Sequence, residues 1–487
     1  MKPEECKNLQ AMFGDRATVD LFERGFYERD VAPVPDLLVL PFGNTLPDIV
    51  IRPQSTEEVA SIVKIAADGS IPLTPRAGGS TAFFNSVCLN KGIVLDLNGL
   101  NEIIQIDAEK HIVRIQAGIT WWALESELSH HGLAIRSYPS SARSATVGGW
   151  LAMLGYGIGS LKYGPLIDQV LSVRIVLPDG QLRELTRTSD PPLTWIAASE
   201  GTLGIITEVE LQVRPRPESE WHGLAAFSDA ANAQLFIENA VKLAEKPFNL
   251  HFSDPGCNAE RYRAGLGSEK STRSFTIAFD ADGTVAETER AAREFRNCLQ
   301  SARGWDLGEE EAQHEWEHRF FSFVLKREGP SMIGAEIWLP IKGLAAYLDS
   351  VARYDLDTRL GLISYSHVET TDHLMVMTAY HTDERDKAGF LQGLAFTKKL
   401  QDIGAKYGGV PYGVGLWNTP YLSRLHSQAE LDELRKRKAR LDPCNIMNPG
   451  KLYKAPFLLN PVFFGLGMEV LAATRGIYRG RTGGLQK

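Results

Sequence analysis

The hydrophobic positions from residue 47 onward follow two patterns in turn. A short apolar run comes first, then apolar residues at helical spacing, then a second apolar run that ends at Pro75. The helical positions are Val59, Ile62, Val63 and Ala66. Ser55 and Glu58 stand at capping-box spacing before them, and Gly69 is expected to stop the helix. This stretch therefore predicts strand, helix, strand and loop.

Apolar runs joined by turn residues continue to about residue 213. They predict strands on both sides of a helix at about 121–130, and the turn Pro178-Asp179-Gly180 predicts a hairpin. A proline-rich exit at 215–217 is the best candidate for a domain boundary.

Residues 220–415 combine long amphipathic helices with strand-like runs. Helices are predicted at about 229–244, 284–302, 343–353 and 384–406. The runs between them include "SFTIAFD", "GAEIWLP", "LISYSHVE" and "LMVMTAYH". This pattern predicts an α+β domain built on an antiparallel sheet. A charged helix, "AELDELRKRKARL", and the segment "DPCNIMNPGKLY" follow.

Composition narrows the class of protein. A chain of 487 residues suggests two or three domains. Its net charge of −8 argues against broad attraction to nucleic acid. The five cysteines are scattered without a CxxC pair, so neither a disulfide framework nor a cysteine metal site is indicated. The opening residues contain no apolar signal-peptide core, so a cytoplasmic location is expected.

Two glycine-rich loops carry the candidate binding chemistry. The first, "TPRAGGST", holds Gly78 and Gly79, and the second is "ATVGGWLAMLGYGIGSLKYG". Glycines let a phosphate approach backbone N–H groups without a Cβ in the way. The nucleotide-triphosphate pattern G-x-x-x-x-G-K-[ST] is absent, and "GYGIGS" does not match the dinucleotide fingerprint. Taken alone, each loop is equally explained by ordinary turn chemistry.

The order of the motifs changes this picture. The two loops, "SEGTLGIITE" and the late "LDPCNIMNPGKLY" together resemble the FAD-linked oxidases of the vanillyl-alcohol oxidase/p-cresol methylhydroxylase superfamily. Within it, the chain is most similar to the FAD subunits of glycolate oxidases and to flavin D-lactate dehydrogenases. The resemblance extends from about residue 10 to 454 and thins in the middle. It implies an α+β protein with a two-subdomain FAD-binding domain of p-cresol methylhydroxylase (PCMH) type and an α+β substrate (cap) domain with an antiparallel sheet.

The resemblance also implies which residues hold FAD. The first loop would wrap the pyrophosphate, and the second would run beside the flavin and the ribityl chain. A later segment that begins at Glu200 would hold the adenosine end. Asn448 and Lys451 would lie where the chain returns to the flavin domain. The residues so assigned are Pro75, Arg76, Ala77, Gly78, Gly79, Ser80, Thr81, Pro139, Ser140, Ser141, Thr146, Gly148, Gly149, Gly155, Gly157, Gly159, Ser160, Tyr163, Gly164, Glu200, Gly201, Gly204, Ile206, Asn448 and Lys451.

The linkage of the flavin is expected to be non-covalent. Relatives with covalent flavin carry a histidine directly after the paired glycines or a cysteine in the second loop. Here these places read Ser80 and "SARSATVGG", and Cys88 lies outside both.

Catalytic candidates come from the second domain. Trp316 and Arg319 match a W-x-x-R spacing in which relatives acting on 2-hydroxy acids grip the carboxylate, although an exposed arginine on a charged helix explains Arg319 equally well. His367 or Tyr412 is a candidate base for the alcohol proton. Relatives often hold a divalent metal through "HxGDGNxH" and "EHGxG".

The metal motifs are only partly retained in this chain. It keeps His367 and has His373 nearby, but Glu369 lies in the altered centre and Tyr412 replaces a histidine. A metal site needs at least three well-placed ligands, so no metal is expected. Whether Glu369 replaces the missing ligand with a carboxylate oxygen stays open.

These inferences predict four segments: an FAD-binding domain at 1–218, a substrate domain at 219–415, a return segment at 416–454 and an apolar-basic tail at 455–487. The tail is too interrupted for a spanning helix, and it is expected either to pack on protein or to contact a membrane surface. The predicted function is an FAD-dependent dehydrogenase of a 2-hydroxy acid that passes electrons to a partner protein, such as an iron–sulfur subunit, or to a quinone.

Three other functions stay open at this stage. They are a flavin electron-transfer subunit of a larger complex, an oxidase of another alcohol such as a phenolic one, and a transferase like alkylglycerone-phosphate synthases.

Overall fold

The computed structural model describes residues 1–33, 43–320, 322–452, 456 and 459–473. The chain divides into two compact units. The first comprises residues 1–156, 165–216 and 413–460, and the second comprises residues 157–164, 217–412 and 461–487. Residues 157–164, which the sequence interpretation placed in the cofactor domain, thus group with the second unit.

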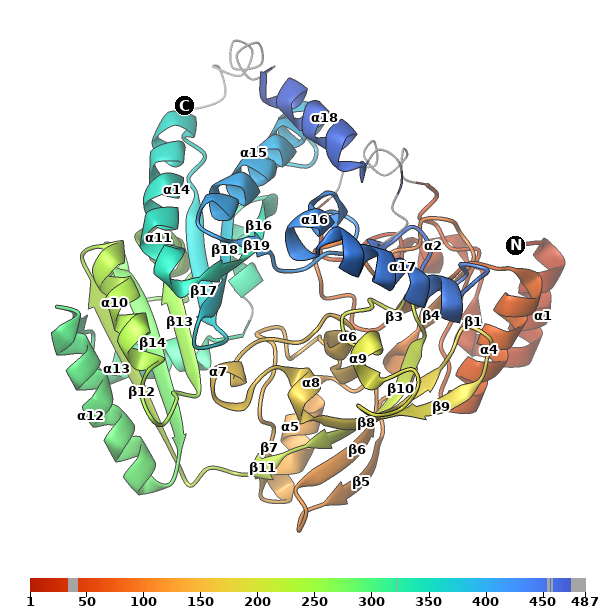
Figure 1. Ribbon diagram of the computed structural model, residues 1–487, viewed down its shortest axis with the longest axis horizontal. Coiled ribbons are helices and arrows are strands. Elements are labelled where there is room, and N and C mark those ends of the chain that lie inside the picture. Colours follow the sequence, from red (N-terminus) through yellow and green to blue (C-terminus); the bar gives the residue numbers. More distant parts are fainter. Residues whose placement is uncertain (34–42, 321, 453–455, 457–458, 474–487) are drawn as a thin grey trace. The chain divides into compact units, whose positions relative to one another are not determined.

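The first unit contains two sheets (Figure 1). A mixed four-stranded sheet has the order β1-β2-β4-β3, with β2, β4 and β3 parallel. Its strands are β1 (Ala17–Thr18), β2 (Ile49–Ile51), β3 (Leu73–Arg76) and β4 (Ile93–Asp96). An antiparallel sheet has the order β5-β6-β10-β8-β9. Its strands are β5 (Ile103–Asp107), β6 (Ile112–Gln116), β8 (Val170–Val176), β9 (Leu182–Leu185) and β10 (Ile205–Gln212). These two sheets are the two predicted subdomains.

The remaining elements of the first unit are short pieces and helices. A two-stranded pair joins β7 (Leu133–Ala134) and β11 (Arg214–Pro215). The helices are α1 (Pro3–Phe13), α2 (Leu21–Gly25), α4 (Thr56–Gly69), α5 (Trp121–His130), α6 (Val147–Ala152), α8 (Leu166–Gln169), α9 (Leu193–Ile196), α16 (Leu422–Leu425) and α17 (Gln428–Leu441). The 3₁₀ turns are η1 (Gly14–Arg16), η3 (Leu97–Gly99) and η7 (Thr419–Tyr421).

Helix α4 shows how the local signals work in the structure. The Ser55 hydroxyl accepts the Glu58 N–H at 3.2 Å, as the N-cap prediction requires. The Glu58 carboxylate accepts instead from the Gln54 N–H and from the Arg16 guanidinium, so the reciprocal half of the capping box is missing. Gly69 is still helical, and Ser70 takes the left-handed C-cap conformation at φ 49°. The helix ends at Gly69, as predicted, and Ser70 takes the C-cap conformation that usually favours glycine.

The second unit is built on one antiparallel sheet of eight strands, in the order β15-β12-β14-β13-β17-β18-β16-β19. The strands are β12 (Ser219–Phe227), β13 (Asn249–Ser253), β14 (Phe275–Gly283), β15 (Trp305–Asp306), β16 (Ser331–Pro340), β17 (Ile363–Val368), β18 (His373–Thr382) and β19 (Val410–Pro411). The antiparallel sheet predicted from residues 220–415 is confirmed.

The helices of this unit pack on both faces of the sheet (Figure 1). They are α7 (Ser160–Tyr163), α10 (Ala230–Ala240), α11 (Pro255–Arg263), α12 (Val285–Ser301), α13 (Glu309–Glu317), α14 (Leu344–Thr358), α15 (Lys387–Lys406) and α18 (Pro461–Ala473), with 3₁₀ turns η4 (Glu269–Ser271), η5 (Ser322–Glu328) and η6 (Ile341–Gly343). Helix α12 covers one face through Phe295, which packs on Phe279 and Phe236. Helix α13 covers the other face, where Ala312 packs against Leu224 and Ala278.

Candidate cofactor and substrate sites

The first glycine loop begins where β3 ends, at Arg76. Gly79 has φ +57°, a conformation that L residues with a side chain rarely adopt. Within the described part of the chain, the backbone N–H groups of Gly78, Gly79, Ser80 and Thr81 donate to no protein acceptor. Four successive unpaired N–H groups in a partly exposed turn are the donor set that an anion needs.

The second loop packs directly against the first. A Cβ built on Gly78 would lie 1.9 Å from the Ser144 carbonyl oxygen. A Cβ on Gly149 would lie 3.5 Å from the Ala77 side chain. Gly78 is thus required because the Ser144 carbonyl leaves no room for a Cβ. The sequence had suggested only the approach of a phosphate as the reason for this glycine.

The start of α6 holds the second loop in place. Thr146 caps the helix by accepting the Gly149 N–H at 3.1 Å. A Cβ on Gly148 would lie 2.6 Å from the Ala117 side chain. Pro139, Ser140 and Ser141 precede this point, and Ser141 closes a turn by accepting the N–H groups of Ser144 and Ala145. The glycine pair of the second loop therefore also serves close packing.

Residues 155–164 divide between the two units. Gly155, at φ +70°, stays in the first unit and lies against the Leu166 side chain. Gly157, Gly159 and Ser160 belong to the second unit, where the Gly159 N–H donates to the Phe248 carbonyl at 3.0 Å and the Gly157 N–H to Ser160 Oγ at 3.0 Å.

The end of this stretch contacts the eight-stranded sheet. The Tyr163 ring packs edge-on against Phe248, and Gly164, at φ +80°, ends α7. Lys162 donates to the Asp282 carboxylate at 3.1 Å. These hydrogen bonds and ring contacts explain why 157–164 groups with the second unit.

In the first unit, one of the two carboxylate oxygens of the buried Glu200 accepts a hydrogen bond from the described residues and the other does not. Its Oε1 accepts the Gly415 N–H at 2.9 Å, and its Oε2 has no hydrogen-bond partner among the described residues. Burial raises the pKa of Glu200 to about 7, against the lowering effects of the Gly415 bond and Lys451. This side chain therefore holds a proton easily and can either donate or accept.

The residues after Glu200 are packing positions. A Cβ on Gly201 would lie 2.4 Å from the Pro75 ring, and a Cβ on Gly204 would lie 2.8 Å from the Ile175 side chain. Ile206 is buried in β10. This segment fixes the end of β3 against the antiparallel sheet.

Asn448 and Lys451 return to this region from the far end of the chain. Asn448 donates to the carbonyls of Asn85 and Glu200 at 2.9 and 2.8 Å, and its Oδ1 has no partner within the described residues. Lys451 donates to the Phe84 carbonyl. Burial lowers the pKa of Lys451 to about 8, and the nearby carboxylates of Asp30 and Glu200 act in the opposite direction.

These groups fit an FAD molecule. The free N–H groups of the first loop suit its diphosphate, and the open oxygens of Glu200 and Asn448 suit its hydroxyl or amino donors. Asp30, which the sequence interpretation missed, supports the loop by accepting the Phe84 N–H at 2.7 Å. No sequence signal distinguishes Asp30 from a surface aspartate.

The second unit brings two histidines together on its sheet. His251 on β13 and His367 on β17 are cross-strand partners, and their Nδ1 atoms are 3.5 Å apart. His367 Nε2 is buried and has no hydrogen-bond partner among the described residues. Burial lowers the pKa of His367 to about 4 and that of His251 well below its usual range. Both rings are therefore neutral near pH 7, as a proton acceptor must be.

Arg319 lies in the same pocket as His367. The pocket is lined by Asn249, His251, Arg261, Ala278, Asp280, Glu315, Trp316, Arg319 and His367. The Arg319 guanidinium stacks on the Trp316 ring at 3.8 Å and donates to the Trp316 carbonyl at 2.8 Å. Trp316 itself stacks on His222, which shares a hydrogen bond of 2.8 Å with Asp280. The predicted carboxylate grip and the predicted base thus line one pocket.

An ion pair forms part of the lining of this pocket. Arg261 on α11 contacts Glu315 on α13 at 2.8 Å, and both side chains are largely buried. Arg261, Asp280 and His251 were not among the site residues predicted from the sequence. The spacing of Asn249, His251 and Ser253 at every second position was the available signal, since it places all three on one face of a strand.

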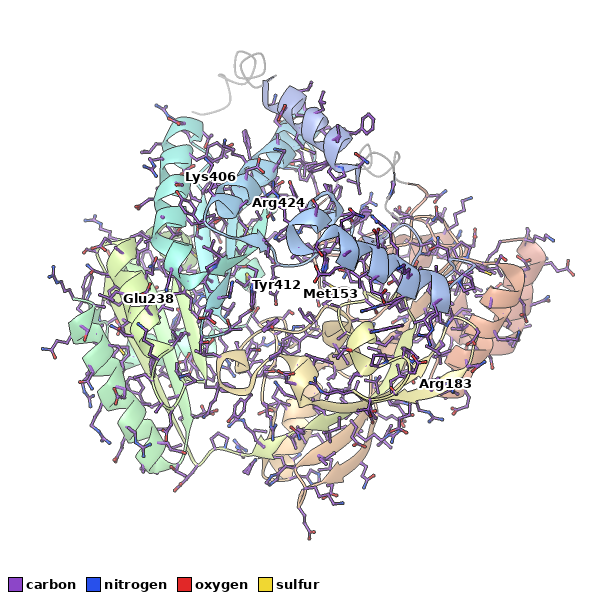
Figure 2. All side chains as sticks on the ribbon, in the orientation of Figure 1. Met153, Arg183, Glu238, Lys406, Tyr412 and Arg424 are labelled. Atoms are coloured by element: carbon purple, nitrogen blue, oxygen red, sulfur yellow. The ribbon has the colours of Figure 1, made fainter. Side chains whose placement is uncertain are left out.

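Tyr412 directly follows β19 (Figure 2) and packs against the buried cluster that contains Tyr365 and Met375. Its ring stacks on Trp338, which stacks on His373, and its N–H donates to the Glu336 carbonyl at 3.1 Å. Tyr412 is not among the residues that line the pocket of Arg319 and His367.

Glu369 is buried after β17, and its Oε2 has no partner in the described part of the chain. Burial raises the pKa of Glu369 well above its usual range, and Glu336 adds to this effect. Over the described residues, no three histidine, cysteine or acidic side chains form a group able to hold a metal ion. The absence of a metal stays a prediction.

Two family models match the chain. One, described as an FAD binding domain, matches residues 47–186, and one, described as the C-terminal domain of FAD linked oxidases, matches residues 216–452.

Curated relatives match over most of the chain. Glycolate oxidase subunit GlcD of Bacillus subtilis is 26% identical, covering 85% of this chain and 90% of that protein. D-lactate dehydrogenase [cytochrome] 1, mitochondrial, of Saccharomyces cerevisiae is 26% identical, covering 84% and 73%.

Solved structures show the same fold. A 4-ethylphenol oxidase from Gulosibacter chungangensis superposes with a TM-score of 0.77 at 17% identity, covering 94% of this chain and 98% of that one. An alkyldihydroxyacetonephosphate synthase superposes with a TM-score of 0.74 at 22% identity, covering 92% and 85%.

Proposed function

Because this chain belongs to the FAD-linked oxidases of the vanillyl-alcohol oxidase/p-cresol methylhydroxylase superfamily, and is an oxidoreductase acting on a CH–OH group, we propose that it dehydrogenates a 2-hydroxy acid to the 2-oxo acid. The observation that carries this proposal is the pocket shared by Arg319 and His367. A guanidinium suits the carboxylate, and a neutral imidazole suits the hydroxyl proton.

The two units have separate tasks in this proposal. The first holds FAD without a covalent bond, through the N–H groups of Gly78–Thr81, with Ser80 at the place of the linking histidine of covalent relatives. When bound, FAD supplies the two-electron acceptor that takes the hydride from the carbinol carbon. The second unit binds the substrate: Arg319 holds its carboxylate, and His367 Nε2 accepts the proton of its hydroxyl.

Electrons then leave to another protein or to a quinone. Relatives named as cytochrome-dependent D-lactate dehydrogenases support an acceptor outside the chain. The described part of the tail forms helix α18, which packs on α15 and leaves apolar side chains exposed. We assign acceptor or membrane contact to this helix. Among the described residues, no helix is long and apolar enough to cross a membrane.

One experiment tests the reaction class. The purified yellow protein is titrated anaerobically with a panel of 2-hydroxy acids and with matched alcohols that lack the carboxylate. Bleaching of the flavin band by one or more hydroxy acids, and not by the matched alcohols, is the expected result. Bleaching by no member of the panel would contradict a dehydrogenase of this class.

A second function has one observation in its favour. Alkyldihydroxyacetonephosphate synthase of Dictyostelium discoideum is 25% identical over 85% of this chain. Turnover of a lipid precursor with no electron acceptor present would indicate such a transferase instead.

A further inference from the structure

A row of four buried side chains in the interior of the second unit ends at His367. His367 Nδ1 faces His251 Nδ1 at 3.5 Å, and His251 Nε2 lies 3.3 Å from Ser253 Oγ. The Ser253 hydroxyl in turn reaches the Cys257 thiol. All four side chains are buried, and His251 and His367 line the pocket of Arg319. The row ends at His367 Nε2, the ring atom without a protein partner in the described structure.

The direction of the hydrogen bonds in this row decides what His367 can do. A neutral imidazole carries one N–H and one lone pair, so the two Nδ1 atoms share a single proton. If His251 donates it, the proton of His367 is on Nε2, and that atom cannot accept another. If His367 donates from Nδ1, its Nε2 keeps the lone pair. The second arrangement requires His251 to donate from Nε2 to Ser253, whose own hydrogen can point to the Cys257 sulfur.

We propose that His251, oriented by Ser253, is a positioning residue that holds His367 in the tautomer whose Nε2 lone pair faces the pocket. His251 accepts the Nδ1 proton of His367, and Ser253 Oγ accepts the Nε2 proton of His251. The hydroxyl proton of a bound substrate then passes to His367 Nε2 with no rearrangement of the rings. This inference rests on the proposed role of His367 as the base.

The charged groups around the row are consistent with two neutral rings. The carboxylate of Asp280, from β14, is hydrogen-bonded to the His222 ring and to the Asn249 amide, each at 2.8 Å. Arg261, from α11, opposes protonation of His251, and its own partner is Glu315 from α13. Among the described residues, neither histidine has a hydrogen bond to a carboxylate, so the neighbours of the two rings select a tautomer and do not stabilise an imidazolium.

The test compares two substitutions of His251. Leucine removes the acceptor for His367 Nδ1, whereas asparagine places an amide oxygen where it can accept that proton. The expected result is that His251→Leu lowers the rate of flavin reduction by about 10- to 100-fold, by analogy with the loss of a residue that orients a metal-ligating histidine. The KM and the flavin content stay within twofold. His251→Asn should restore most of the rate, and Ser253→Ala should cost less than His251→Leu.

A measurement without substrate reads the tautomer directly. Nitrogen NMR of the protein labelled with ¹⁵N-histidine should show a pyridine-like His367 Nε2, assigned by its loss in His367→Gln. In His251→Leu this signal should move toward the pyrrole-like range. Ser366→Ala is the matched control, because Ser366 is buried beside His367 on the opposite face of β17. It should change neither the rate nor the spectrum.

The outcomes separate this inference from the proposed function. If His367→Gln leaves flavin reduction intact, the base assignment itself fails. If His367→Gln abolishes reduction while His251→Leu keeps both the rate and the pyridine-like signal, only the positioning role fails. Equal losses in His251→Leu and His251→Asn, with an unchanged signal, would indicate a packing role and would also overturn the inference.

Discussion

The backbone of Gly78 lies against the carbonyl oxygen of Ser144, so closely that a Cβ at position 78 would be 1.9 Å from that oxygen. This contact joins the two glycine loops, which belong to separate parts of the sequence. Position 78 therefore does two things: it offers a free N–H group and it lets the second loop approach.

Gly78→Ala should cost FAD occupancy. The neighbour is a backbone carbonyl that cannot turn aside as a side chain can, so the two loops must separate. We expect at least a fivefold fall in the flavin absorbance per chain of the purified protein. Gly25→Ala is the matched control, because a Cβ there meets nothing within 4 Å. Full flavin content in Gly78→Ala would show that the loops tolerate separation.

The flavin should leave the protein on denaturation. Ser80 cannot form the link that a histidine forms in covalent relatives, so acid precipitation should release all yellow colour into the supernatant. The measurement is the flavin absorbance of supernatant and pellet, compared with Ser80→Ala, which should behave identically. Colour retained in the washed pellet would contradict non-covalent binding.

Arg319→Lys should weaken substrate binding without loss of flavin. Lysine keeps the charge but loses the planar fork and the stacking on Trp316, which lies 3.8 Å from the guanidinium carbon. A charge-assisted hydrogen bond contributes about 1.5–3 kcal/mol, so a rise in KM of roughly 10- to 100-fold is expected for a 2-hydroxy acid. Arg385→Lys, an exposed arginine paired only with Asp383 among the described residues, is the control. An unchanged KM would remove Arg319 from the site.

Much of the fold was predictable because its signals are local. The helix predicted at 121–130 is α5, and the helix at 284–302 is α12, one residue shorter at each end. The contact of Gly78 with Ser144 could not be predicted, since it depends on how two distant loops meet. The alternation of Asn249, His251 and Ser253 placed His251 on one face of a strand, but its importance comes from its register with His367, which the sequence does not show.

The buried carboxyl of Glu369 should make stability depend on pH. Its side chain is 1% exposed, and its folded-state pKa lies well above the usual value of 4.5. The folded protein therefore binds more protons than the unfolded chain above pH 4.5, and stability falls as pH rises through that region. Glu369→Gln removes the ionisable group, so its Tm should exceed that of the wild type by a few degrees at pH 8 and match it near pH 5. The exposed control Glu109→Gln should have the Tm of the wild type at both pH values. If the Tm of Glu369→Gln changes with pH in parallel with that of the wild type, the Glu369 carboxyl does not titrate in this range.

The last prediction concerns helix α18. Its side chains Val462, Phe463, Leu466 and Val470 are 66%, 52%, 61% and 58% exposed, and the helix packs on α15. Exposed apolar side chains gathered on one helix mark a contact surface, and the sequence that follows contains Arg475, Arg479 and Arg481 but no acidic residue.

The double variant Phe463→Ser, Leu466→Ser should keep its flavin and its anaerobic reduction by substrate, because neither residue lies in the cofactor loops or in the pocket. It should lose most of its co-purification with the electron acceptor or with membranes, measured by pull-down and by flotation with anionic vesicles. Leu356→Ser, at a residue 78% exposed on α14, is the control and should retain both. Retention of both associations in the double variant would place the contact surface elsewhere on the molecule, and loss of flavin would make α18 a packing element.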